Sequence, residues 1–337
     1  MRYVVIVLTL AVLAPLRTYG ALGVADAQIT VKVQDDNGRP IEHAHVVVSF
    51  NIPKTMNSWD GTKNVEVKGT TDTNGLFSAA SSTLRKIHVT AEKQGYYRSS
   101  TYYSFKSSEQ ELLHAEKWQP WNPTLDIRLR KKSKPVPLNA KWLHNVEFPE
   151  SDNPVGYDLL TGDWVAPHGK GKKSDFTFNL IRDYISPSDY SLTLIIVTAR
   201  AHDGFFGISD DDVSPQSELF LPRQAPETGY NVTNIVVSQS SSTTKSVGSD
   251  WFVRTPQANH FFFRIRTELD DEGQVKKAHY GKLVGPIKFE YHPVIAKTGK
   301  LELRYYVNPE PGDRNLEFDP KKNLFKNLEW SEQVKKP

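Results

Sequence analysis

The fold is decided by residues 28–50, which read QITVKVQDDNGRPIEHAHVVVSF. Apolar side chains occupy every second position on either side of a polar centre, at Ile29, Val31 and Val33 and at Ala44, Val46, Val48 and Phe50. Such alternation buries one face of a β-strand and exposes the other. The Asn37-Gly38 pair between the two runs accepts the positive φ of a tight turn. The segment therefore predicts two strands joined by a turn.

Residues 51–132 continue this pattern. One strand is expected to end near Thr71, a turn follows at residues 72–75, and the next strand starts at Leu76. Alternation predicts further strands around residues 87–91 and 125–129, and no stretch has a long helical period. Short strands between Gly and Asn turns are typical of a β-sandwich. The first domain is therefore predicted as a sandwich over residues 28–132.

Three motifs in this domain carry a family resemblance: DNGRPI at residues 36–41, TDTNGLF at 71–77 and GY at 95–96. Their order resembles the carboxypeptidase regulatory-like domain, an Ig-like sandwich of transthyretin type, although the connections at residues 53–64 and 107–122 are longer here. The resemblance implies a non-catalytic accessory module with a folding, spacing or binding role, often in envelope proteins that handle glycans or peptides. The family has no fixed binding residues to carry over.

A basic stretch with two prolines, KKSKPVP at residues 131–137, follows the first domain. Proline stiffens the chain and removes a backbone donor, so an extended linker is predicted over residues 133–141. Strand patterns return in residues 142–337, where the apolar run at residues 192–197 predicts a strand buried on both faces. Around residues 261–306, alternation with charged side chains predicts a solvent-exposed charged face. The second domain is therefore predicted as a larger antiparallel sandwich, which makes the whole chain all-β.

Two motifs of the second domain carry a further resemblance: GDWVAPHGKGK at residues 162–172 and NPEPGDRNLEFD at 308–319. The region of residues 155–320 is similar to uncharacterised secreted proteins of environmental bacteria. This resemblance implies no activity.

The N-terminus has the features of a secretory signal peptide. Arg2 precedes an apolar run at residues 3–16, and Ala25-Asp26-Ala27 has the small residues of a cleavage site, so residues 1–27 are interpreted as the signal. A cut after Gly20 is the alternative. The run is shorter than the roughly 20 residues of a membrane-spanning helix. We therefore expect export to the periplasm or the medium, without an integral membrane segment in the mature chain.

Composition narrows the chemistry. The sequence has no cysteine, which excludes disulfides, thiolate nucleophiles, cysteine-held metals and lipid attachment through an N-terminal cysteine. Loss of Arg2, Arg17 and Asp26 with the signal lowers the net charge from +3 to +2. This near balance argues against nucleic acid as a partner. No cofactor is predicted.

Aromatic side chains are the most suggestive candidates for ligand binding. They are Tyr96, Tyr97 and Tyr102 around one bend, and Trp118 and Trp121 in a proline-containing loop, with Trp59 in a second loop. Exposed rings stack on sugar faces, and loops at the ends of sandwiches are common ligand sites. The competing interpretation is that many of these rings fill a small core. A glycan, or another envelope protein, is the expected partner.

Three polar candidates are interpreted more simply. The loop at residues 168–173 lacks the spacing of a P-loop and is expected to be a solvated hairpin. His43 and His45 share one strand face but have no recognisable further metal ligand. Asp203 and residues 210–212 do not fit an EF-hand, so a polar turn is expected there. No metal site is therefore predicted.

The motifs of common enzymes are absent: there is no G-x-S-x-G, no H-E-x-x-H and no G-x-G-x-x-G. The sequence predicts no catalytic residue. We therefore expect an exported, non-enzymatic binding or assembly protein. The alternative is a secreted hydrolase of polysaccharide whose two carboxylates meet only in space, roughly 5–9.5 Å apart in an open groove.

Overall fold

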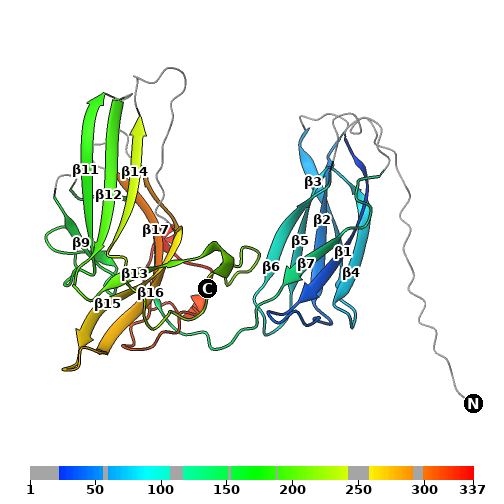
Figure 1. Ribbon diagram of the computed structural model, residues 1–337. Coiled ribbons are helices and arrows are strands. Elements are labelled where there is room, and N and C mark those ends of the chain that lie inside the picture. Colours follow the sequence, from blue (N-terminus) through cyan, green and yellow to red (C-terminus); the bar gives the residue numbers. More distant parts are fainter. Residues whose placement is uncertain are drawn as a thin grey trace, which may run out of the picture. The chain divides into compact units, whose positions relative to one another are not determined.

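The computed structural model describes residues 23–55, 60–106, 117–150, 153–186, 189–241, 258–290 and 299–337. These residues form seventeen strands and a few short 3₁₀ helices, which confirms the predicted all-β fold (Figure 1). The chain divides into two compact units. The N-terminal unit comprises Met1–Lys132 with Gln216–Glu218, and the C-terminal unit comprises Ser133–Pro215 with Leu219–Pro337.

The N-terminal unit contains two sheets. The first has the order β4 (Leu76–Thr83), β1 (Ala25–Gln34) and β7 (Thr124–Arg128). The second has the order β3 (Thr62–Thr70), β2 (His45–Pro53), β5 (Lys86–Glu92) and β6 (Ser99–Ser104). Strand β1 pairs antiparallel with β4 and parallel with β7, whereas the pairs of the second sheet are antiparallel.

The core of this unit is formed by the alternating residues of the opening segment. The side chains of Ile29, Val31 and Val33 in β1 pack in one cluster with those of Val46, Val48 and Phe50 in β2, and all six are fully buried. The predicted alternation is therefore confirmed. Strand β1 starts at Ala25, three residues before the expected domain start at Gln28.

Both predicted turns are closed by an aspartate. Asp35 Oδ1 accepts hydrogen bonds from the backbone N–H groups of Asn37 and Arg39, at 2.8 and 2.9 Å. Asp72 Oδ1 accepts equivalent bonds from Asn74 and Leu76. The glycine of the second turn, Gly75, has a φ of 74°, and a Cβ there would lie 2.5 Å from the carbonyl oxygen of Val33. Glycine is required at that position.

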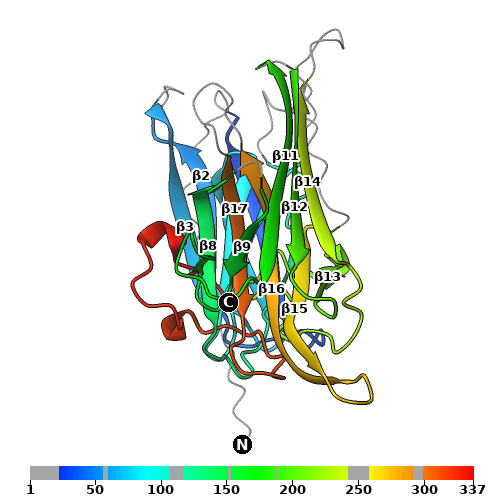
Figure 2. The same ribbon diagram turned by 90° about the vertical axis from the view of Figure 1, so that its left-hand side faces the viewer.

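The C-terminal unit contains two five-stranded sheets (Figure 2). One has the order β10 (Asp163–Trp164), β9 (Val155–Asp158), β11 (Phe176–Ser186), β12 (Asp189–Thr198) and β14 (Asn234–Ser241). The other has the order β13 (Gly204–Ile208), β15 (His260–Leu269), β16 (Val275–Glu290), β17 (Lys300–Val307) and β8 (Asn139–Glu147). Their facing side chains, including Leu194, Phe263 and Tyr305, form one core cluster.

Burial along β12 differs from the prediction. Leu192, Leu194 and Ile196 are buried in the core, but the residues between them are only half-buried. The strand therefore buries one face fully, since only that face is covered by the second sheet.

The outer face of the second sheet differs from the prediction over much of its area, because loops cover it, although Lys288 remains exposed beside Glu302 as predicted. Phe262, Tyr280 and Tyr306 on this face pack against loop residues that include Leu221, Tyr230, Leu316 and Phe318. Lys282 on the same face is fully buried and donates a hydrogen bond of 2.9 Å to the carbonyl of Leu316. The face therefore supports a second core.

Three short helical segments of the described residues are single turns: η2 (Asp210–Asp212), η3 (Pro320–Lys322) and η4 (Trp330–Glu332). Across the described ranges, no helix has the length and apolar character needed to cross a membrane.

Candidate functional site

A shallow hollow of about 380 Å³ lies on the outward face of the four-stranded sheet of the N-terminal unit. We call it the Tyr102 hollow. Its lining comprises Ser49, Asn51, Thr62, Asn64, Leu84, Lys86, Ile87, His88 and Tyr102. The volume falls at the lower end of the roughly 300–1,000 Å³ range of small-molecule sites.

Strand register brings these side chains to one face. His88 of β5 lies opposite both Ser49 of β2 and Tyr102 of β6, and Asn51 lies opposite Asn64 of β3. Residues that face one another across neighbouring strands point to the same side of the sheet. The positions between them, such as Phe50, point into the core. Polar outward positions on four strands therefore converge on one surface.

The aromatic ring of Tyr102 is the most prominent group in the hollow. Tyr102 is 62% exposed to solvent. The ring centroid lies 4.7 Å from that of His88, and the Lys86 ammonium lies 4.2 Å from the ring centroid. Burial, together with the charge of Arg98, lowers the pKa of His88, so its imidazole is neutral at pH 7. The Tyr102 ring thus contacts two side chains of β5 and remains exposed to solvent.

Asn51 supplies a second distinctive group. Its side chain is half-buried, and its Oδ1 has no hydrogen-bond partner among the residues described. A buried acceptor without a partner costs roughly 1–3 kcal/mol relative to a satisfied one. Asn51 therefore brings an unsatisfied acceptor to the lining of the hollow, although the Oδ1 atom itself is buried.

A salt bridge limits the charge available at the edge of the hollow. The Lys68 ammonium lies 2.7 Å from a Glu66 carboxylate oxygen. This contact, with a hydrogen bond from Ser49, lowers the pKa of Glu66. Besides Leu84 and Ile87, the side chains that line the hollow carry hydroxyls, carboxamides, an imidazole and one ammonium, and no carboxylate.

The five aromatic residues predicted from the sequence do not gather in one place. Tyr102 lines the hollow, Trp121 is 41% exposed in a separate loop, and Tyr96 is half-buried. Tyr97 and Trp118 are each only 4% exposed. Trp118 donates from Nε1 to the carbonyl of Thr83 at 2.8 Å. Tyr97 and Trp118 are therefore packing residues, and Trp59 lies outside the described residues.

Several residues of the hollow were not identified from the sequence. Asn51, Asn64, Lys86 and His88 are ordinary polar residues at alternate strand positions. Their only signal is the period-two pattern, which marks them as outward-facing. Which strands lie side by side cannot be obtained from that pattern.

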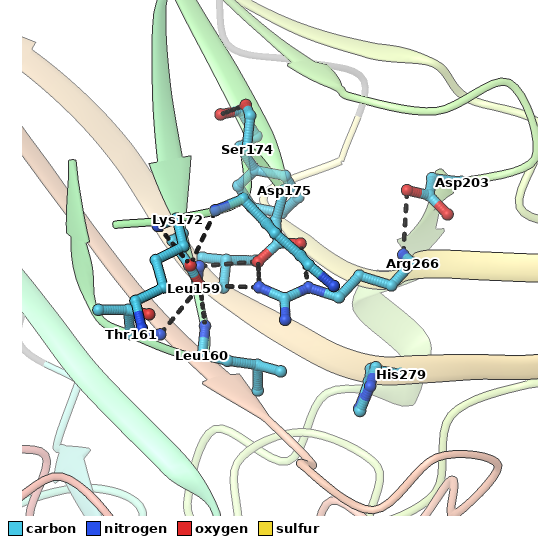
Figure 3. Close-up of polar contacts among 12 residues, drawn as sticks. Leu159, Leu160, Thr161, Lys172, Ser174, Asp175, Asp203, Arg266 and His279 are labelled. Carbon is cyan, nitrogen blue, oxygen red and sulfur yellow. Dashed lines mark hydrogen bonds and ion pairs between the residues drawn. The ribbon is translucent and has the colours of Figure 1, made fainter. Parts of the chain in front are cut away.

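A compact group of carboxylates lies in the C-terminal unit, around Arg266 (Figure 3). The Arg266 side chain donates to both carboxylate oxygens of Asp175, at 2.7 and 2.9 Å, and to Asp158 Oδ1 at 2.7 Å. Asp203 accepts hydrogen bonds from the backbone N–H groups of Arg266 and Thr267. Arg266 adopts a φ of 54° where the register of β15 shifts.

Burial and hydrogen bonding shift the pKa values of Asp158 and Asp175 in opposite directions. Burial would raise the pKa of Asp158, but hydrogen bonds from the backbone N–H groups of Lys172, Thr161 and Lys173 lower it. Burial raises the pKa of Asp175 in spite of the contact with Arg266. The side chains of Asp158 and Asp175 are 3% and 1% exposed. A glycosidase pair needs an open groove, so this cluster is a structural ion-pair network.

The glycine-lysine loop is held by Asp158 of this cluster and by Asp163. Asp158 Oδ2 accepts from the backbone N–H groups of Lys172 and Lys173, and Asp163 Oδ2 accepts from that of Lys170. An anion cradle needs free N–H groups. Those three are already engaged, so the loop offers no such cradle. It joins β10 to β11, which pair with opposite edges of β9 and not with each other, so the predicted hairpin is wrong.

The histidine and aspartate candidates also fall at turns or strand ends. His43 has a φ of 53° and precedes β2, so it does not share a strand with His45, in contrast to the expectation. Residues 210–212 form the turn η2. Within the described part of the chain, no group of three or more His, Asp or Glu side chains is placed to hold a metal ion.

Known proteins offer little guidance. No protein-family model matches the chain, and no curated protein matches it. Among solved structures, a variant of the catechol 1,2-dioxygenase of Acinetobacter radioresistens shares 17% identity over 34% of this chain and 54% of its own, with a TM-score of 0.26. The chlorocatechol 1,2-dioxygenase of Pseudomonas putida shares 16% over 34% and 64%, with a TM-score of 0.25.

A shaft pilin of Lactobacillus rhamnosus GG shares 11% identity over 55% of this chain and 91% of its own, with a TM-score of 0.23. Of the two dioxygenases, by contrast, this chain covers only about half to two thirds of the length. Similarity at this level does not establish a function.

Proposed function

We propose that this is an exported, non-enzymatic binding protein whose ligand is a glycan, bound in the Tyr102 hollow. The observation that carries the proposal is an exposed aromatic ring that lines one hollow, on one sheet face, together with carboxamide and hydroxyl groups of the neighbouring strands.

The chemistry of a sugar suits these groups. A pyranose ring has an apolar C–H face, which packs on an aromatic ring, and a rim of hydroxyls. Carboxamides both donate and accept hydrogen bonds, and so match those hydroxyls. Tyr102 supplies the stacking surface, and a sugar hydroxyl would satisfy Asn51 Oδ1 once the Asn51 side chain turned this buried atom toward the hollow. The Lys86 ammonium adds a donor beside the ring.

Export and family membership are parts of the same proposal. The apolar run at residues 3–16 supports a signal, and periplasm or medium would be the destination. The turn and core positions of the N-terminal unit support a carboxypeptidase regulatory-like module. Such a module would act as the binding part of the chain.

Isothermal titration of the mature protein against a panel of soluble polysaccharides tests the proposal. We expect heat of binding with at least one glycan, loss of it in Tyr102→Ala, and retention in Tyr102→Phe, which keeps the ring. Trp330→Ala is the matched control, because Trp330 is 75% exposed with the Lys335 ammonium 4.2 Å from its ring centroid. Absence of heat with every glycan, or equal loss in the control, would refute the proposal.

A further inference from the structure

The Ala25-Asp26-Ala27 triplet, which has the composition of a signal cleavage site, is built into the folded sandwich. It forms the first three residues of β1, and its members lie opposite Thr83, Ser82 and Ser81 of β4. The residues Ala25 and Ala27 are 7% and 1% exposed and belong to the core cluster. The triplet is therefore part of a strand of the folded domain and contributes two side chains to its core.

Asp26 also holds a neighbouring segment. Its backbone carbonyl accepts a hydrogen bond of 2.8 Å from the N–H of Trp118, and its carboxylate accepts one of 2.7 Å from the Ser82 hydroxyl. The indole of Trp118 is buried and donates in turn to the carbonyl of Thr83, opposite Ala25. Removing the triplet would take away the acceptor for the backbone N–H of Trp118. It would also leave the core positions of Ala25 and Ala27 empty.

We propose that the signal is removed upstream of Val24, so that the mature chain keeps all of β1. This inference rests on the proposed export. Small residues at the two positions that a signal peptidase recognises occur in this region twice, at Thr18 and Gly20 and at Ala21 and Gly23. The mature chain then begins at Ala21 or at Val24. Cleavage is hydrolysis: one water is consumed, the new carboxylate remains on the signal, and the new amino group begins the mature chain.

The direct test is the intact mass and N-terminal sequence of the protein exported by a bacterial host that expresses the full chain. A first residue of Ala21 or Val24 supports the proposal. A first residue of Gln28 overturns it and leaves export standing. An unprocessed chain retained in the cytoplasm overturns both this inference and the export on which it rests.

A second measurement asks whether the triplet matters to the fold. Chains that begin at Ala21, Val24 and Gln28 are produced without the signal and melted. We expect the first two to melt together, and the N-terminal unit of the third to melt lower by about 5 °C or more. Equal melting of all three would show that the triplet is dispensable and would overturn the structural argument.

Discussion

The imidazole of His88 and the phenol ring of Tyr102 lie opposite one another on β5 and β6, with ring centroids 4.7 Å apart. Their pairing places a neutral polar ring against an exposed aromatic one. It also defines one wall of the hollow in which Asn51 keeps an unsatisfied acceptor. The candidate site is thus created by strand register, and not by a loop motif.

Asn51→Leu should separate binding from stability. Leucine removes the unsatisfied acceptor, so the free energy of unfolding should stay unchanged or rise by up to about 1 kcal/mol. Affinity for a bound glycan should fall about tenfold, because a ligand hydroxyl loses its acceptor. Denaturant unfolding and titration on the same samples measure both quantities. A fall in stability without a change in affinity would assign Asn51 a structural role only.

Arg266→Met should destabilise the C-terminal unit by about 3–5 kcal/mol, because Asp158 and Asp175 would be left buried without their partner. Denaturant unfolding measures the loss. Arg200→Met is the control, since Arg200 is exposed, and should change stability by no more than about 0.5 kcal/mol. Converting both aspartates to asparagine in the Arg266→Met chain should restore part of the loss. A cost below about 1 kcal/mol for Arg266→Met would contradict the network described.

Trp118→Ala should destabilise the N-terminal unit by about 3–5 kcal/mol, because it empties a buried site and removes the bond to Thr83. Trp121→Ala should cost no more than about 0.5 kcal/mol, since that ring is partly exposed. Thermal or denaturant melts compare the two. Similar costs for both variants would mean that the two tryptophans are not as differently placed as the structure has them.

The C-terminal unit should lose stability as the pH falls below about 6.5. Burial lowers the pKa of His260 and of His279 below the ordinary 6.5, so the folded unit keeps both neutral while the unfolded chain binds protons. Their contribution is therefore complete above 6.5 and is lost as the pH falls. His260 Nδ1 also accepts a hydrogen bond from the Gly285 N–H, which protonation would abolish.

Melting at pH 7.5 and 5.5 measures this effect, and His260→Gln isolates one histidine. We expect a smaller difference between the two melting temperatures in the variant than in the parent. Two aspartates affect stability at lower pH. Burial raises the pKa of Asp175, so its protonation favours the folded unit as the pH falls. The pKa of Asp158 is lowered, so its stabilising contribution is lost as the pH falls. An unchanged difference in the variant would contradict a buried, neutral His260.

The strands and turns of the N-terminal unit were predictable because their causes are local. The alternation at Ile29, Val31 and Val33 needs only the geometry of an extended chain. The Asp72 turn needs only a side chain that reaches its own backbone two and four residues on. Composition likewise set the absence of thiol chemistry, since the chain has no cysteine.

The site and the second core depend on residues far apart in the sequence. Tyr102 and Trp118 are both aromatic residues that the sequence marks in the same way, yet Tyr102 is exposed and Trp118 is buried. Lys282 has the period of an exposed strand residue, yet a distant loop at Leu316 covers it. By itself the sequence determined which residues form strands and turns. Only the tertiary structure decided which strands pair and which faces are covered, because both are set by contacts that no local period encodes.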